Sequence, residues 1–153
     1  MALAAEVTTI LCVADSSSSL SGKYFTISGM GTDFEQNDYH IWIDVGSAST
    51  EPSGLSSTGV EVDISADASA ATVATAVNSA LDALADFGSS RSTATLTVTN
   101  AVRGAVTDAA NVDAGFTIST ATDGTGTKNS NHKHPEDDVV WFIQGDNLAI
   151  ATT

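Results

Sequence analysis

The stretch TGVEVDISADASAATVATAVNSALDALA, residues 58–85, changes its hydrophobic period part-way along and thereby decides the fold class. Over residues 60–64, valine and isoleucine alternate with acidic residues, which is typical of a strand with one buried face. Ser69 then offers a cap for the first backbone donors of a helix. The apolar residues that follow recur at helical spacing among many alanines: Val73, Val77, Leu81 and Leu84. The pattern predicts a strand and then an Ala-rich helix over residues 70–85.

Four other segments alternate apolar and polar residues, as half-buried strands do. Residues 23–28 and 40–45 are separated by a turn-rich stretch and are expected to pair as a hairpin. Residues 93–99 place threonine on one face, which suits a solvated sheet, and residues 116–118 mark a further strand. The sequence predicts an α+β fold, mainly antiparallel β-sheet, with the helix covering the apolar face of the first three strands.

The hydrophobic pattern divides the chain into one central module and two tails. Residues 1–20 are expected to form an extended N-terminal arm, and residues 21–120 the α+β module. Residues 121–138 are rich in Gly, Asn and acidic residues and predict a polar linker. Residues 139–153 place two apolar runs around Gln-Gly-Asp-Asn, which predicts a C-terminal β-hairpin.

The charge balance disfavours several classes of partner. Five Lys and Arg stand against nineteen Asp and Glu, which gives a formal net charge of −14. Binding to nucleic acid requires a basic patch that displaces counterions from phosphates, and the few cations here are scattered. An anionic membrane surface is disfavoured for the same reason. The N-terminal residues lack the cationic start of a signal peptide, and no apolar run is long enough to span a bilayer.

Two polar clusters carry side chains that could ligate a metal. His132 and His134 stand beside the acidic residues 136–138, and a second cluster comprises Asp33, Glu35 and Asp38. Neither spacing matches a zinc signature or an EF-hand, and solvated loops are the favoured interpretation. The prediction is no metal and no cofactor.

No constellation in the sequence predicts catalysis. The single cysteine, Cys12, lies in an apolar run, where a buried and inert thiol is the usual outcome, and it has no partner for an intrachain disulfide. A Gly-x-Ser-x-Gly elbow, a phosphate-binding loop and a dinucleotide fingerprint are all absent from the sequence. We expect that the protein is not an enzyme.

Trp42 has two open interpretations. It shares a strand face with His40 and Asp44, opposite the apolar face. An exposed tryptophan there could stack on a sugar ring or anchor a protein interface, whereas a buried one would belong to a second, smaller core under the N-terminal segment. Together with apolar residues of the two tails, it makes up the candidate interface residues: Val7, Leu11, Trp42, Trp141, Phe142 and Ile143.

The order of several short segments resembles a module found in virion proteins of tailed bacteriophages. In that family a KYF strand, a YYVWF-like strand and a TGVEV strand precede an Ala-rich helix, and TVTN and GFT strands follow it. The corresponding segments here are KYF at 23–25, YHIWIDV at 39–45, TGVEV at 58–62, the helix from residue 70, TVTN at 97–100 and GFT at 115–117. The resemblance covers residues 22–120 and leaves out both tails.

This resemblance implies a non-enzymatic structural role in a virion that is assembled in the host cytoplasm, and it supplies no catalytic residues. The expected partners are other virion proteins, either the major capsid or a tail protein, and further copies of this chain in a homo-oligomer. A capsid decoration or cement protein is expected before a tail or neck component. The alternative is a host-surface carbohydrate-binding module that uses Trp42 and the acidic loop at residues 33–38. Because an isolated hairpin is marginally stable, residues 139–153 are expected to add to a sheet edge during assembly.

Overall fold

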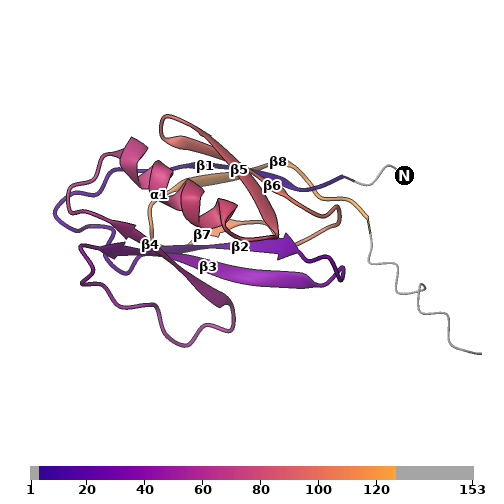
Figure 1. The fold of residues 1–153 in the computed structure, drawn as a ribbon, viewed down its shortest axis with the longest axis horizontal. Coiled ribbons are helices and arrows are strands. Elements are labelled where there is room, and N and C mark those ends of the chain that lie inside the picture. The colour runs from indigo at the N-terminus through magenta and orange to yellow at the C-terminus, as the bar shows by residue number, and fades with distance from the viewer. Residues whose placement is uncertain (1–3, 127–153) are drawn as a thin grey trace, which may run out of the picture.

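Two four-stranded β-sheets pack face to face, and one helix runs along one side of them (Figure 1). This computed structural model describes residues 4–126. One sheet, called the β1 sheet, has the strand order β5-β6-β1-β8, with β1 spanning Val7–Leu11, β5 Phe87–Ser92, β6 Thr95–Asn100 and β8 Thr117–Thr122. The other, called the β3 sheet, has the order β4-β3-β2-β7, with β2 spanning Tyr24–Met30, β3 Gln36–Val45, β4 Thr58–Ile64 and β7 Ala110–Asn111. The helix α1 spans Ala70–Asp82.

The fold class predicted from the sequence, α+β and mainly sheet, is confirmed. β2 and β3 pair antiparallel, with Phe25 opposite Ile41, as the predicted hairpin requires. β4 instead pairs parallel to β3, with Val62 opposite Ile43. A parallel connection has to return the chain to the starting end of the previous strand, and residues 46–57 make this return.

The core lies between the sheets, because apolar side chains alternate inward along the strands of both. Fully buried side chains come from the β1 sheet (Ile10, Leu96 and Val98) and from the β3 sheet (Phe25, Ile27, Ile41, Ile43 and Val62). Among residues 4–126, no helix combines the length and the apolar character needed to cross a membrane.

Helix α1 begins after Ser69, whose side chain accepts a hydrogen bond from the backbone N–H of Thr72 at 3.2 Å. The residues that its spacing assigns to the core are fully buried, or in the last case partly buried: Val73, Val77, Leu81 and Leu84. The helix contacts β4 of one sheet and β5 of the other, so it closes one side of the sandwich. The predicted position over the face of the first three strands is wrong, because the β1 sheet occupies that face.

The N-terminal segment belongs to the domain, so the prediction that residues 1–20 form an arm outside the module is wrong for residues 7–11. β1 is a central strand that pairs antiparallel with both β6 and β8. Thr8, Ile10 and Cys12 point inward and are at most 3% exposed. The strand is hard to detect in the sequence because threonine interrupts its apolar alternation and both partner strands come from the distant C-terminal half.

Two boundaries on the C-terminal side also differ from those predicted. The sequence of β5, FGSSRS, contains no β-branched residue, and this strand forms by pairing with β6. β8 continues through Ala121 and Thr122, which are the first residues of the predicted linker. Several predictions lie outside the described residues: the linker beyond residue 126, the polar cluster around His132, and the C-terminal hairpin with Trp141, Phe142 and Ile143.

Candidate interaction surface

The outward face of the β1 sheet is a regular array of small, uncharged side chains. Strand register sets them in three transverse rows, each crossing β5, β6, β1 and β8 in that order. The rows are Ser92, Thr95, Leu11 and Thr117; Ser90, Thr97, Thr9 and Ser119; and Gly88, Thr99, Val7 and Thr122. We call these positions the hydroxyl face, because most of them are serine or threonine.

Alternation along the strands creates this face. Successive residues of a strand point to opposite sides of the sheet, so the neighbours of the buried Ile10, Leu96 and Val98 point to the outside. Thr97 and Ser119 are exposed there. β-branched threonine suits a pleated surface that faces water on one side.

No position of the hydroxyl face carries an ionisable side chain, although the chain has a net charge of −14. Covering a charged surface removes water from ions, which is unfavourable unless each charge finds a partner. Hydroxyl groups both donate and accept hydrogen bonds, so they can adapt to polar groups of either kind. Another macromolecule can therefore cover this face at low electrostatic cost.

Two of the predicted interface residues, Val7 and Leu11, lie on this face, where both belong to its central strand β1. Leu11 is 44% exposed, and Val13, just beyond the end of the strand, is 36% exposed. Leu11 stands between Thr95 and Thr117 in the first row. The hydroxyl face thus has an apolar spot at one end, which suits a protein contact.

The β3 sheet differs, because the returning loop of residues 46–57 is fastened to its outward face. At one point Asp44 accepts hydrogen bonds from the backbone N–H groups of Ala48 and Ser49, at 3.0 and 2.8 Å. The hydrogen bond from the Ser49 N–H is the main reason why the pKa of the Asp44 carboxyl lies below its usual value. Asp44 is buried beneath this end of the loop.

At a second point His40 holds the loop through both ring nitrogens. Its Nδ1 lies 2.9 Å from Ser57 Oγ, and its Nε2 lies 3.0 Å from Glu51 Oε1. A Cβ at Gly59 would overlap the Glu51 carboxylate, so the loop can lie this close only over a glycine. Serine, histidine and glutamate are the residue types of a hydrolytic triad. Here the imidazole is 2% exposed and ties two points of the loop to the sheet.

Trp42 lies on the same strand face, between His40 and Asp44, and is 6% exposed. It is therefore buried on the outward face of the β3 sheet, between the two residues to which residues 46–57 are hydrogen-bonded. The sugar-stacking and interface interpretations of Trp42 are wrong for this reason. The carbohydrate-binding alternative loses the aromatic residue on which it depended.

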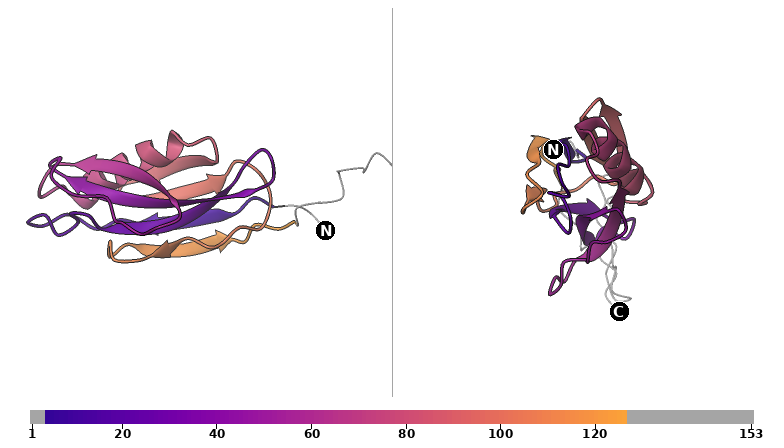
Figure 2. Two further views of the ribbon diagram at one scale, coloured as in Figure 1. Left: turned by 90° about the horizontal axis from the view of Figure 1, so that it is seen from below. Right: turned by 90° about the vertical axis from the view of Figure 1, so that its left-hand side faces the viewer.

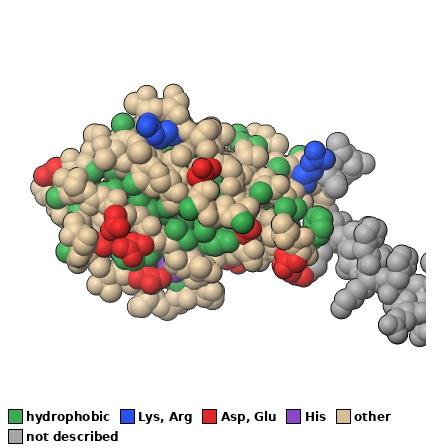
Figure 3. All heavy atoms as spheres, viewed as in Figure 1, with side chains coloured by type: hydrophobic (Ala, Val, Ile, Leu, Met, Phe, Trp, Pro, Cys, Tyr) green, Lys and Arg blue, Asp and Glu red, His purple; other side chains and the backbone are tan. Residues whose placement is uncertain are grey.

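Acidic side chains gather in the region of β4 (Figure 3). Carboxylate oxygens of Asp44, Glu61 and Asp63 lie within 4.8 Å of one another, and among residues 4–126 this is the group that could offer three ligands to a cation. Partial loss of hydration, and then the charges of Asp63 and Asp44, raise the pKa of the exposed Glu61 carboxyl. The parallel register sets Asp63 beside Asp44, a pairing that the sequence did not predict. Glu61 and Asp63 are exposed, and exposed acidic groups are common without an ion.

The predicted acidic cluster at residues 33–38 is divided between a turn, which holds Asp33, and the start of β3, which holds Asp38. Asp33 Oδ1 accepts a hydrogen bond from the backbone N–H of Glu35 at 3.1 Å. Asp38 accepts hydrogen bonds from Ser28 Oγ at 2.8 Å and from Gln36 Nε2 at 2.7 Å. Neighbouring groups thus engage both aspartates, and the loop that the sequence favours is shorter than predicted because residues 36–38 belong to β3.

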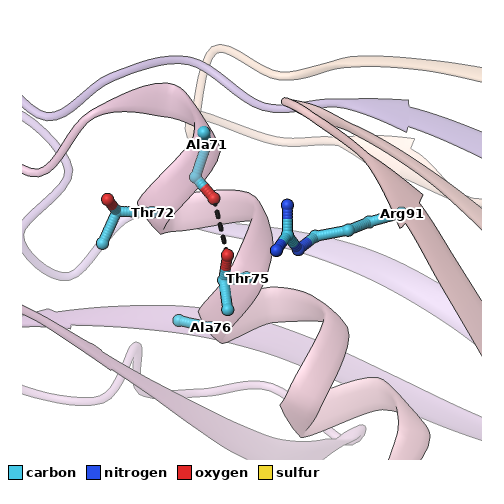
Figure 4. A pocket seen from close by; sticks show the side chains of 5 residues that line it. All are labelled: Ala71, Thr72, Thr75, Ala76 and Arg91. Carbon is cyan, nitrogen blue, oxygen red and sulfur yellow. Dashed lines mark hydrogen bonds between the residues drawn. The ribbon is translucent and has the colours of Figure 1, made fainter.

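A shallow groove lies between α1 and β5 (Figure 4), and it is lined by Ala71, Thr72, Thr75, Ala76 and Arg91. The Thr75 hydroxyl donates to the backbone oxygen of Ala71 at 2.8 Å, and the Arg91 side chain extends toward the helix. A specific small-molecule site needs several convergent polar groups in a concave pocket. One arginine over an open groove does not provide them.

A buried carboxyl stands beside the hydroxyl face, one residue before β1. Glu6 is 3% exposed, and its pKa is raised to about 7 by burial and then by the charges of Asp108 and Asp123. Residues 4 and 125 form a backbone bridge nearby, with N–O distances of 3.0 and 3.3 Å. The two ends of the described chain are therefore joined next to a carboxyl that titrates near neutral pH.

Comparisons with known proteins returned no match to a family model, to a curated protein or to a solved structure. The resemblance to virion proteins of tailed bacteriophages therefore stays a prediction. The hydroxyl face is the feature of the described residues from which a function can best be inferred.

Proposed function

We propose that this protein is a non-enzymatic structural component of a bacteriophage particle, a capsid decoration protein by first choice and a tail or neck component by second. The observation that carries the proposal is the hydroxyl face, an uncharged sheet surface in a strongly acidic chain. The order of sequence segments that resembles virion proteins supports the same role. The partners would be other virion proteins, with neither nucleic acid nor membrane bound.

The charge distribution suits a subunit that is first free and then docked. A net charge of −14 keeps free subunits soluble and apart through mutual repulsion. A carboxylate buried without a partner in an interface would oppose docking strongly. The hydroxyl face avoids that penalty, because the side chains it would bury are hydroxyl, methyl and leucine groups.

The size of the hydroxyl face suits a contact that is repeated many times. Four strands about 4.8 Å apart, each contributing about 16 Å of length, give an area of roughly 300 Å². A standard protein interface buries about 800 Å² on each partner. One such face would bind weakly alone, whereas many copies on a lattice, or a second contact from each subunit, would hold firmly.

The test places charge at the centre of the face. Thr97→Glu combined with Thr99→Glu should leave the protein folded, because both side chains are exposed, and should remove it from purified particles. Thr75→Glu with Ser79→Glu, both on the exposed side of α1, adds the same charge as a matched control and should be incorporated normally. Copies per particle are counted by quantitative gel and located by electron microscopy. Normal incorporation of the double variant, or absence of the natural protein from particles, would refute the proposal.

A further inference from the structure

The two sheets have edges that differ in how they are covered. The β5 edge is closed by α1, since Ser89 Oγ donates to the backbone oxygen of Asn78 at 3.0 Å and the Ser89 N–H donates to Asp82 Oδ1 at 3.3 Å. The β4 edge also contacts α1. β7 is an edge of only two residues. Short, covered or charged edges are the usual devices by which proteins prevent unwanted strand pairing.

Among residues 4–126, β8 is six residues long, uncharged and not covered by the helix. It lies along the margin of the sandwich opposite α1 (Figure 2), and among the described residues it pairs only with β1. Its sequence, TISTAT, contains no charged residue and no proline, and its side chains are exposed or half-buried. A register shift falls near Thr122, so residues 117–120 form the regular part of the edge. Unpaired backbone groups along such a strand are a template for one more strand.

The chain itself carries a segment of matching character. Residues 139–143, Val-Val-Trp-Phe-Ile, are β-branched or aromatic and uncharged, so they favour an extended conformation and bring no repulsion to the edge. This segment follows β8 in the sequence, with residues 123–138 between them. The acidic residues 136–138 lie outside the part that would pair.

The length of the connection favours a second copy as the acceptor. A hairpin on the same edge needs a loop of about two to five residues. Residues 123–138, if extended, reach up to about 50 Å, which is well beyond the length of β8. We propose that residues 139–143 of one copy add as a strand to the β8 edge of a second copy. Each copy then gives one strand and receives one, a head-to-tail contact that closes into a ring or continues as a chain.

This association does not depend on the proposed role in a particle, so purified full-length protein can test it. Sedimentation at increasing concentration should show oligomers. Thr117→Lys with Ser119→Lys, which charges the β8 edge, should weaken association by about tenfold or more. Ser90→Lys with Ser92→Lys is the matched control, because these residues lie in the same rows at the opposite edge, and it should associate normally. Equal weakening by both variants would show that the face, and not the edge, is the contact.

Cross-linking decides which chain supplies the strand. Copies with Ser119→Cys are mixed with copies with Gln144→Cys and treated with a short bis-maleimide; the native Cys12 is buried. The expected product joins one copy of each kind, and its yield should fall when the copies with Ser119→Cys also carry Thr117→Lys, which charges the β8 edge. A chain that carries both Ser119→Cys and Gln144→Cys is treated in the same way. If this chain cross-links within itself and the mixture of single variants gives no product, the segment pairs with its own β8 and the exchange between copies is refuted. A monomer at all concentrations would refute it as well.

Discussion

The outward faces of the two sheets differ in what covers them. On the β3 sheet, the loop of residues 46–57 is tied down at His40 and at Asp44, and Trp42 is buried between them. On the β1 sheet, no segment of the described residues covers the face, which consists of hydroxyl and apolar side chains. Within residues 4–126, one sheet thus has an outer layer formed by its own chain, and the other has none.

The difference follows from strand direction. β3 and β4 are parallel, so the chain between them has to travel back along the sheet and can cover it on the way. The β1 sheet is antiparallel throughout, so its connections stay at the ends of the strands and leave the face open. An aromatic residue on the first face is therefore structural, whereas small residues on the second face are the better candidates for binding.

The largest effect on stability is expected in the core between the two sheets. Leu81 is fully buried on α1, and Leu81→Ala should lower the free energy of unfolding by about 2 to 5 kcal/mol through lost burial and a cavity. Leu84→Ala, at a half-buried position, is the control and should have a smaller effect. Urea denaturation measures both. A change of only a few tenths for Leu81→Ala would mean that the helix does not close the sandwich.

The next largest effect on stability is expected on the outward face of the β3 sheet, which residues 46–57 cover. Trp42→Ala should destabilise the protein by about 3 kcal/mol, at the lower end of the range for a buried aromatic side chain because the loop can settle into part of the space. Limited proteolysis should then cut within residues 46–57 faster than in the natural protein. If neither stability nor cleavage changes, the loop does not form a sealed layer over the β3 sheet.

Two of the buried carboxyls, Glu6 and Asp44, should give opposite pH responses. The folded protein holds the Glu6 proton up to about pH 7, whereas the unfolded chain releases it near 4.5. Unfolding therefore releases a proton between these pH values, and this group makes stability fall as the pH rises through that window. Glu6→Gln should stabilise the protein by about 1 to 2 kcal/mol at pH 8 and have little effect at pH 4.

Asp44 provides the contrast for this measurement. Its pKa is lowered in the folded state, so its contribution is present above its unfolded pKa and is lost as the pH falls through the folded value. Asp44→Asn should therefore destabilise the protein at pH 8 and differ less from the natural protein in strong acid. Equal pH profiles for the two variants would contradict the assigned environments of the carboxyls.

The smallest effect on stability is expected on the hydroxyl face. Leu11 is 44% exposed, so Leu11→Ala should change the free energy of unfolding by less than about 0.5 kcal/mol. The same variant should weaken docking, because it removes the apolar spot of the hydroxyl face. A large loss of stability would show that this face is not free in the isolated protein.

The sequence by itself determined the elements whose own side chains alternate strongly. Residues 23–28, 40–45 and 60–64 and the helix after Ser69 were predictable because each pattern is complete within a few turns or residues. The burial of Val73, Val77 and Leu81 followed from spacing alone.

The tertiary structure decided everything that depends on which segments meet. β1 and β5 carry weak patterns and exist as strands through pairing with β6, and the parallel register of β3 and β4 determines that Trp42 is buried. The same register brings Asp63 beside Asp44. The hydroxyl face joins positions from four strands, and only their register sets them in rows. Local propensity acts over neighbouring residues, whereas these features arise from contacts between distant parts of the chain, which no local pattern encodes.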